Sequence, residues 1–295
     1  VGFQTEGDVQ NFIRYVVSEH PGSNIGVFQA TNRQVVLNQN DRQIRVGAFP
    51  VGVDTVEFEK RARLAARSSF VKKAVESLDG RTLMIGVDRL DYSKGLTQRM
   101  EAVDLFFSNR PDWRGKVIYL QIAPKSRSEI QEYQELGQAL GAVAGRINGK
   151  FGEVAWTPIR YVNRAYSRTE LAGLYRSARV GLITPLRDGM NLVAKEYVAA
   201  QDAGDPGVLI LSRFAGAAAE CRDALLVNPF DPESVASAIA RALEMPLAER
   251  RDRHNHILAT LSLNNSDVWG TWFLRSLQKL ELVRSEAEFW VLENS

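Results

Sequence analysis

Short apolar runs rich in β-branched residues alternate with longer amphipathic stretches along most of this 295-residue chain. Runs such as VGLIT and GVLIL are unbroken, which is typical of strands buried on both faces of a sheet. The predicted strands are Asn24–Ala30, Leu83–Val87, Lys116–Ile122, Ile159–Val162, Val180–Thr184, Val208–Leu211 and Ala224–Val227. The predicted helices are Glu57–Ser77, Thr97–Asn109, Ser126–Gly145, Arg168–Ser177, Asn191–Asp202, Pro232–Leu243 and Leu247–Leu261. Since this alternation requires right-handed crossovers, it predicts an α/β fold with a doubly wound parallel sheet.

The composition is that of an ordinary globular protein, with 45% hydrophobic and 24% charged residues. The formal net charge of +2 comes from Lys and Arg scattered among nearly as many carboxylates, which argues against a nucleic-acid partner. No run approaches the roughly twenty apolar residues of a membrane-spanning helix, and no signal peptide is visible. We therefore expect no membrane partner.

The chain has one cysteine and three histidines, too few residues for a disulfide framework and few candidate ligands for a metal site. Cys221 has no second cysteine to pair with, which fits a reducing compartment and predicts a cytoplasmic location. Together with this cysteine, His20, His254 and His256 are too few to favour a soft-ligand metal site. His254 and His256 lie in the charged run RRDRHNH, and we expect both on a solvated helix face.

Two places in the sequence have the character of domain boundaries. Pro50–Asp54 joins a strand to a charged helix and would serve as a hinge. Near the other end, a turn precedes an aromatic helix in which Trp269, Trp272 and Phe273 lie close together. Such a cluster favours packing against another domain over a cofactor site. The predicted divisions are 1–54, 55–262, and 263–295, the last being a helix that packs back on the first division, plus a tail.

The segment TPLRDGMNLVAKE, residues 184–196, places polar residues just beyond a predicted buried strand. A glycine-containing turn follows Thr184 and a helix starts near Asn191. Unpaired amides and the positive end of the helix dipole would therefore lie at the carboxyl edge of the sheet. Asp188 would accept hydroxyl hydrogen bonds there, and Glu196 would point from the helix toward the same opening. The alternative is an acidic helix start at which Asp188 is only a cap.

A second segment of this kind, VDRLDYSKG, follows the strand that ends at Val87. Arg89 offers a fork of donors for two phosphate oxygens, and Lys94 places a compact charge at a helix start. A cation at that end of a helix is locally unfavourable unless an anion neutralises it, so Lys94 favours an anionic ligand. The alternative pairs Arg89 and Lys94 with the neighbouring Asp88 and Asp91.

A third segment, QIAPKSR at residues 121–127, also links a strand end to a helix start. Each motif is weak alone, but three charged strand ends would converge on one edge of a parallel sheet. Their convergence predicts an anionic, sugar-like ligand in a crevice at the carboxyl edge.

Four long stretches are more specific than any of these motifs: RLDYSKGL (89–96), APKSR (123–127), AGRINGKFGEVAWTPIRYVN (144–163) and TPLRDGMNLVAKEYVAAQ (184–201). With GFQTE (2–6) and SRFAGAAAE (212–220), they extend over nearly the whole chain. In these stretches the sequence resembles the trehalose-6-phosphate synthase family of retaining glycosyltransferases. The resemblance implies a GT-B arrangement of two Rossmann-like domains, in which 55–262 is the nucleotide-sugar-binding domain and 1–54 the end of the other.

The resemblance implies transfer of glucose, with retention, from UDP-glucose or another nucleoside-diphosphate glucose to glucose 6-phosphate, which gives α,α-trehalose 6-phosphate. It implies that Arg89 and Lys94 bind the donor diphosphate and that Arg127 binds the acceptor phosphate. It also implies that Asp188 accepts hydroxyls of the donor glucose and that Glu196 accepts those of the ribose. The other implied donor contacts are the amides of Gly189, Met190, Asn191 and Leu192, and a base pocket lined by Tyr166 and Leu171.

The implied mechanism uses no metal and no cofactor. No carboxylate is placed as an obvious nucleophile, in contrast to the close carboxylate pair of a retaining glycosidase. The leaving diphosphate, neutralised by Arg89 and Lys94, would accept the proton of the acceptor while an oxocarbenium-like sugar forms. Since the protein would supply positioning and electrostatics, Arg89, Lys94 and Asp188 are the candidate catalytic residues.

The chain opens near the last strand and helix of the family's N-terminal domain, and that domain's glycine-rich loop and sugar-binding residues are absent. We therefore expect the missing domain to be a partner for residues 1–54 and for the helix from Val268, and the chain alone to bind nucleotide without transferring glucose. Two other interpretations stay open: a relative with another acceptor, and a non-catalytic regulatory module. The intact residues Arg89, Lys94, Asp188 and Glu196 argue against the latter. UDP, GDP and ADP all remain candidate donor nucleotides, and a homo-oligomer is compatible with the sequence.

Overall fold

The computed structural model describes residues 1–19, 26–31, 34–39, 42–125 and 131–278. The chain divides into two compact units. The larger unit is Thr55–Ser262, and the smaller combines Val1–Asp54 with Leu263–Ser295.

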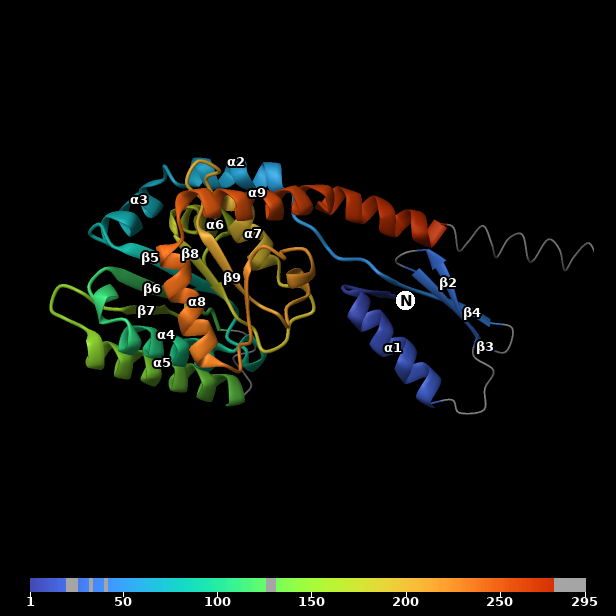
Figure 1. Cartoon of the computed structure of the whole chain (residues 1–295), viewed down its shortest axis with the longest axis horizontal. Coiled ribbons are helices and arrows are strands. Elements are labelled where there is room, and N and C mark those ends of the chain that lie inside the picture. The colour runs from blue at the N-terminus through green and yellow to red at the C-terminus, as the bar shows by residue number, and fades with distance from the viewer. Residues whose placement is uncertain (20–25, 32–33, 40–41, 126–130, 279–295) are drawn as a thin grey trace, which may run out of the picture. The chain divides into compact units, whose positions relative to one another are not determined.

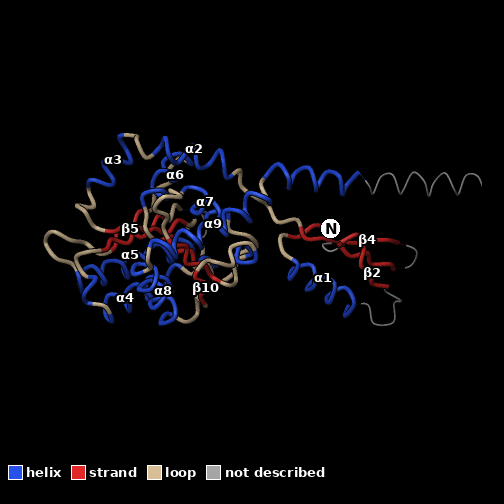
Figure 2. Tube along the Cα trace, turned by 45° about the horizontal axis from the view of Figure 1, so that its top comes forward, coloured by secondary structure: helices blue, strands red, loops and turns tan. Residues whose placement is uncertain are grey.

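A six-stranded sheet forms the centre of the larger unit, with the strand order β10-β9-β8-β5-β6-β7 and parallel pairing throughout. Figure 2 shows its strands in red among the helices. Its strands are β5 (Thr82–Val87), β6 (Val117–Ile122), β7 (Ile159–Val162), β8 (Val180–Ile183), β9 (Val208–Ser212) and β10 (Leu225–Val227). The chain runs from β5 outward to β7 and then returns to β8 on the other side of β5. This is the order of a doubly wound Rossmann sheet, so the predicted fold class is confirmed. The direction of winding reverses between β5 and β8.

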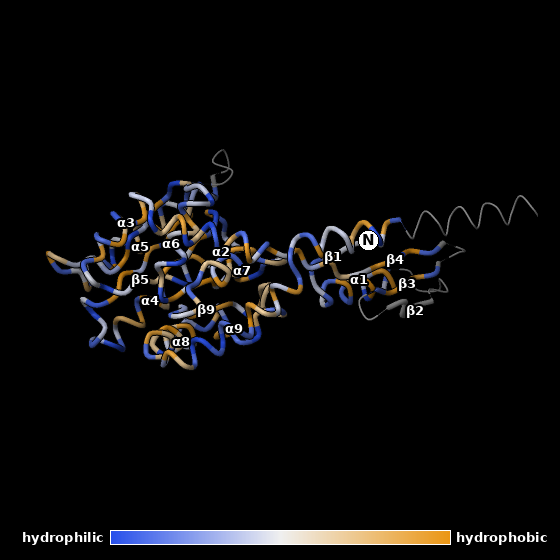
Figure 3. Tube along the Cα trace, turned by 90° about the horizontal axis from the view of Figure 1, so that it is seen from above, coloured by the Kyte–Doolittle hydropathy of each residue, from blue (hydrophilic) through white to orange (hydrophobic). Residues whose placement is uncertain are grey.

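Helices cover both faces of this sheet (Figure 1). α2, α3, α6 and α7 pack against one another on one face, and α4 packs between α5 and α8 on the other. Hydrophobic and hydrophilic residues alternate along these helices (Figure 3), as expected for helices with one buried side. Their bounds are α2 (Thr55–Ala65), α3 (Ser69–Glu76), α4 (Leu96–Asn109), α5 (Gln131–Phe151), α6 (Arg168–Ser177), α7 (Leu192–Ala200), α8 (Pro232–Glu244) and α9 (Leu247–Leu263). Short 3-10 turns are η1 (Tyr92–Lys94), η2 (Pro111–Trp113) and η3 (Gly216–Ala219).

The prediction of one helix over Glu57–Ser77 is wrong, because Ser68 interrupts it. Ser68 is extended, with ψ 153°, and its hydroxyl accepts a hydrogen bond from the amide of Val71, which starts α3. Serine favours this capping role over a place inside a helix, since its side chain competes for backbone amides. The chain therefore makes two shorter helices, α2 and α3.

One residue-level expectation for the larger unit, the exposure of His254, is wrong. His254 is 5% exposed and its Nε2 lies 3.1 Å from the carbonyl oxygen of Val198. The prediction of a solvated His254 is thus wrong, because its side of α9 packs against α7, whereas His256 is 69% exposed as expected. Cys221 is a free, buried cysteine.

The smaller unit holds a four-stranded sheet of order β1-β4-β3-β2. Its elements are β1 (Gly2–Phe3), α1 (Glu6–Glu19), β2 (Gly26–Thr31), β3 (Gln34–Gln39) and β4 (Arg42–Ala48). Only β1 and β4 pair in parallel as in a Rossmann-like domain, and β2, β3 and β4 form an antiparallel meander. The sequence pattern predicted one strand, Asn24–Ala30, where three follow in succession.

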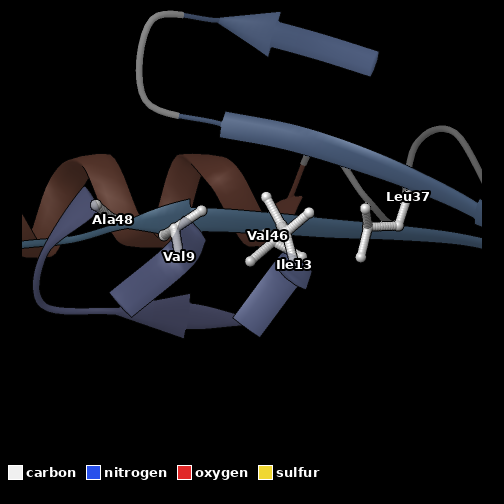
Figure 4. Packing of buried hydrophobic residues seen from close by; sticks show 5 residues of the cluster. All are labelled: Val9, Ile13, Leu37, Val46 and Ala48. Carbon is white, nitrogen blue, oxygen red and sulfur yellow. The ribbon is translucent and has the colours of Figure 1, made fainter. Parts of the chain in front are cut away.

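An apolar cluster joins α1 to this sheet (Figure 4): Val9 and Ile13 pack with Leu37, Val46 and Ala48. Residues 266–278 form a further helix in the same unit. Trp272 lies 4.4 Å from the ring of Phe49, between ring centroids. In the part of the chain that the structure describes, no helix combines the length and apolar character that a bilayer span requires.

Candidate active site

Two loops meet at the point where the winding of the sheet reverses. One follows β5 and runs from Asp88 to Gly95, and the other follows β8 and runs from Thr184 to Asn191. The amides of Leu186 and Arg187 donate to the carbonyl oxygen of Ser93, at 2.8 and 3.3 Å. The carboxyl edge at such a reversal is where open α/β sheets bind their ligands.

An ion pair joins the two loops: Lys94 Nζ lies 2.6 Å from Asp188 Oδ2, and the side chains are only 15% and 13% exposed. The alternative pairing of Lys94 with Asp88 or Asp91 is therefore wrong. Asp88 pairs with Arg99, and Asp91 accepts from the amide and hydroxyl of Ser93 at 2.9 and 2.7 Å. Burial alone would raise the pKa of Asp91, but these two hydrogen bonds, together with the charges of Lys94 and Arg89, outweigh it and lower that pKa.

The backbone around Asp188 is fixed by the loop that follows β9. The Asp188 amide donates to the carbonyl oxygen of Phe214 at 3.2 Å, and the Asp188 carbonyl accepts from the amide of Gly216 at 3.0 Å. The Asp188 carboxylate also accepts from Asn191 Nδ2 at 3.0 Å and from the amide of Met190 at 3.3 Å. Asp188 is thus held from several directions, with its carboxylate beside Lys94.

The start of α7 has an unusual backbone at Asn191, whose φ is 73°. Asparagine tolerates this left-handed conformation better than most residues, and its side chain caps the helix by accepting from the amide of Ala194 at 3.1 Å. The expectation that Asp188 is only a helix cap is therefore not met, since Asn191 takes that place. Just before it, Gly189 is exposed and a side chain there would meet open space. Leu192, the first residue of α7, is 38% exposed.

Gly95 allows the two loops to approach each other. Its φ is 63°, and a Cβ atom at this position would lie 2.6 Å from the carbonyl oxygen of Thr184. Any other residue would therefore both strain the backbone and push the loops apart. The glycine in the SKG sequence is a geometric requirement of the Lys94–Asp188 contact.

Arg89 lies on the same loop as Lys94 but differs in its surroundings. It is exposed, and among the described residues it has no hydrogen-bond or ion-pair partner. Arg89 and Lys94 thus place two cations on the loop that meets the Thr184–Asn191 loop, where Asp188 neutralises Lys94. This combination suits an anion with two phosphate groups.

Glu196 and Arg168 form a second polar pair, on α7 and α6. Arg168 Nε lies 3.0 Å from Glu196 Oε1, and the Glu196 side chain is 15% exposed. Burial raises the pKa of Glu196, while the charge and hydrogen bond of Arg168 act against that rise. Glu196 was expected to point at the loop opening, and the structure gives it Arg168 as a partner, which the sequence did not indicate.

The two residues expected at a base pocket lie beside α3 and on α6. The Tyr166 ring lies 5.4 Å from that of Phe70, between centroids, and lines a mostly apolar cavity of about 210 Å³. Leu171 is half-buried in α6. In the described ranges, no hydrogen bond, ion pair or ring contact links either residue to Lys94 or Asp188.

The strand end of β6 also reaches this edge, since the amide of Leu90 donates to the carbonyl oxygen of Pro124 at 3.0 Å. The expected convergence of three strand ends is therefore observed. Arg127 lies outside the described residues. Within those residues, no group of three or more His, Cys, Asp or Glu side chains is placed to hold a metal ion.

Sequence reasoning missed Arg99, which α4 places beneath both loops. Its side chain is fully buried and donates to Thr184 Oγ1 at 2.9 Å, to Asp88 Oδ2 at 2.6 Å and to Gln121 Oε1 at 3.1 Å. Arginines are rarely buried unless they are paired. The sequence showed only one more polar residue in an amphipathic helix.

A doubly wound Rossmann sheet with a cationic and a carboxylate loop at its reversal point has the architecture of the Rossmann-like domains found in GT-B glycosyltransferases. Residues 1–279 match the family model of glycosyltransferase family 20. The chain belongs to this family.

The chain is similar to a trehalose-6-phosphate synthase of Sinorhizobium fredii, with 51% identity over 94% of this chain and 58% of that relative. Among solved structures, it is similar to an alpha,alpha-trehalose-phosphate synthase (UDP-forming) from Burkholderia xenovorans in complex with glucose-6-phosphate. That match has a TM-score of 0.90 and 46% identity, and covers 94% of this chain and 60% of the other. An Escherichia coli protein bound with UDP-2-fluoro glucose gives a TM-score of 0.86 and 41% identity, with 94% and 60% covered. The chain thus spans about 60% of the length of these proteins.

Proposed function

We propose that this chain is the nucleotide-sugar-binding part of a trehalose-6-phosphate synthase, which transfers glucose with retention from UDP-glucose to glucose 6-phosphate. The observation that carries the proposal is the contact between Lys94 and Asp188 at the reversal point of the sheet. Relatives with 46% and 41% identity bind glucose-6-phosphate and UDP-2-fluoro glucose, respectively. The proposed substrates follow from these two relatives.

The donor diphosphate would bind between Arg89 and Lys94. Lys94 pairs with Asp188, so a donor diphosphate would compete with that carboxylate for the ammonium. Arg89 is exposed and has no ion-pair partner among the described residues, although the charge of Asp91 also acts on it, and it would make the first contact. As the bond to glucose breaks, both cations would stabilise the charge that develops on the leaving diphosphate.

Asp188 would then be free to accept hydroxyls of the donor glucose, beside the exposed amide of Gly189. Glu196 would accept the ribose hydroxyls, and Leu192, exposed at the start of α7, would contact the nucleoside together with Tyr166 and Leu171. The acceptor phosphate would bind Arg127. The leaving diphosphate would take the acceptor's proton, so the reaction needs no protein nucleophile, and we propose that it proceeds without a metal or other cofactor in the cytoplasm.

Titration of UDP, GDP and ADP into the chain tests the binding half of the proposal. We expect measurable heat with UDP and unchanged affinity in the presence of EDTA. No heat with any of the three nucleotides would overturn the assignment. Transfer is assayed in a protein that has both Rossmann domains, where the α,α configuration of the product is read by NMR. If that protein instead transfers glucose to an unphosphorylated sugar or to another acceptor, the result favours the alternative of a related transferase with a different acceptor.

A further inference from the structure

Arg99 is a buried arginine at the reversal point of the sheet, and its guanidinium donates four hydrogen bonds. It lies in the first turn of α4 with 1% of its surface exposed. Its guanidinium donates to side chains at the ends of three strands: Asp88 after β5, Gln121 in β6 and Thr184 after β8. A fourth bond goes from Nη2 to the backbone carbonyl oxygen of Lys94 at 3.3 Å.

These four acceptors come from both halves of the site. Lys94 carries the ammonium of the β5 loop, and Thr184 is the residue from which the Asp188 loop begins. One rigid planar group therefore sets the spacing between the two loops. A lysine cannot reproduce this, because its ammonium lacks the fixed fork of five donors.

The surrounding residues make room for a guanidinium. At Gly86, in β5, a Cβ atom would lie 2.9 Å from Arg99 Nη1 and 2.5 Å from the hydroxyl of Tyr119. Any side chain at that position would displace the Arg99 group. The carboxylate of Asp88 neutralises its charge at 2.6 Å, so Arg99 adds little field at the opening and acts through geometry.

We propose that Arg99 is a positioning residue that holds Lys94 and the Asp188 loop at the separation a donor diphosphate requires. This inference rests on the proposed function. Because Arg99 bonds the backbone of Lys94, a shift of its guanidinium moves the ammonium, whereas the pocket for the nucleoside on α6 and α7 has no bond to it. The loss on changing Arg99 is therefore confined to the diphosphate.

The test compares UDP with uridine, which has the same base and ribose but no phosphate. Arg99→Lys should weaken UDP binding by about 10- to 100-fold, the range expected for the loss of one hydrogen bond to a charged group. Uridine binding, followed by ligand-observed NMR, should stay within about twofold of the wild-type value. Thr184→Val, which removes only the acceptor of the Nε bond, should give a smaller loss in the same direction and serves if Arg99→Lys fails to fold.

Arg250→Lys is the matched control. Arg250 is also a buried arginine, bonded to the carbonyl oxygen of Met245 at 3.2 Å and to Asp205 at 2.7 Å, on α9. It should lower the melting temperature without changing either affinity. The positioning role is wrong if Arg99→Lys weakens the binding of UDP and of uridine equally. It is also wrong if Arg99→Lys and Thr184→Val both bind UDP as tightly as the wild type. Neither result would affect the proposed function. A wild-type chain that binds no UDP would overturn the proposed function and this inference together.

Discussion

Lys94 Nζ and Asp188 Oδ2 lie 2.6 Å apart, in side chains that are 94 positions apart in the sequence. Each side chain is largely shielded from solvent. A pair with this burial is worth more than a surface ion pair, and separating it leaves each charge without its partner. The two charges therefore neutralise each other, and a diphosphate that binds Lys94 must replace Asp188 as its partner.

Replacing Asp188 with Asn should strengthen UDP binding by about threefold or more, because Lys94 then has no competing carboxylate. The affinity for UDP-glucose should increase less than the affinity for UDP, since the sugar hydroxyls lose a charged acceptor. Calorimetry with both ligands measures the two changes. Asp104→Asn is the control, because Asp104 pairs with Lys150 and Arg146 of α5. Weaker UDP binding in Asp188→Asn would contradict the competition.

Glu196→Gln should reduce the preference for UDP over 2′-deoxy-UDP by about tenfold, the worth of a hydrogen bond to a charged group. Burial raises the pKa of Glu196 above 4.5 against the opposing effect of Arg168. The neutral acid is a poorer acceptor, so UDP affinity should fall as pH falls through that raised pKa, and Glu196→Gln should remove this part of the dependence. Glu244→Gln, at an exposed pair with Arg110, should change neither property. An unaltered deoxy preference would remove Glu196 from the ribose contact.

His254 predicts a pH dependence of folding. Burial lowers its pKa below 6.5, and the hydrogen bond to Val198 opposes the shift only in part. The unfolded chain therefore binds a proton more readily than the folded one, so the free energy of unfolding should fall as pH drops below 6.5, down to the folded pKa. Urea unfolding at several pH values between 7 and 5 measures the slope of the free energy of unfolding against pH. This slope should be smaller in His254→Gln than in the wild type. The exposed His256→Gln should keep the wild-type slope, and equal slopes in all three proteins would contradict the account.

The periodic pattern of the larger unit was sufficient to predict its fold, because strands such as β8 and β9 are buried on both faces and read as continuous apolar runs. Parallel pairing brings all carboxyl ends to one edge, so the convergence of the Lys94 and Asp188 loops followed as well. The sequence did not predict which charged side chains pair with one another at that edge. Asp188 competes with nearer carboxylates for Lys94, and the choice depends on β8 lying beside β5, a pairing between distant segments.

The burial of two helical residues, Arg99 and His254, could not be predicted from the sequence either. Both lie in stretches with many polar residues, and their burial is decided by what packs against that side of the helix. For Arg99 the determining partner is Thr184, 85 positions away; for His254 it is Val198, 56 positions away. In the smaller unit, β3 and the bounds of β4 were missed because QVVLNQ has polar residues at both ends and RQIRVGA has three polar residues among its first four. Their strand character comes from pairing with each other.

Removal of the Lys94 charge tests the central claim most directly. Lys94→Ala should bind UDP about 100-fold more weakly than the wild type by calorimetry, since one preorganised charge contact is worth roughly 3 kcal/mol. Lys150→Ala is the control, because Lys150 pairs with Asp104 outside the site, and it should bind UDP normally. A folded Lys94→Ala chain that binds UDP as tightly as the wild type would contradict the account.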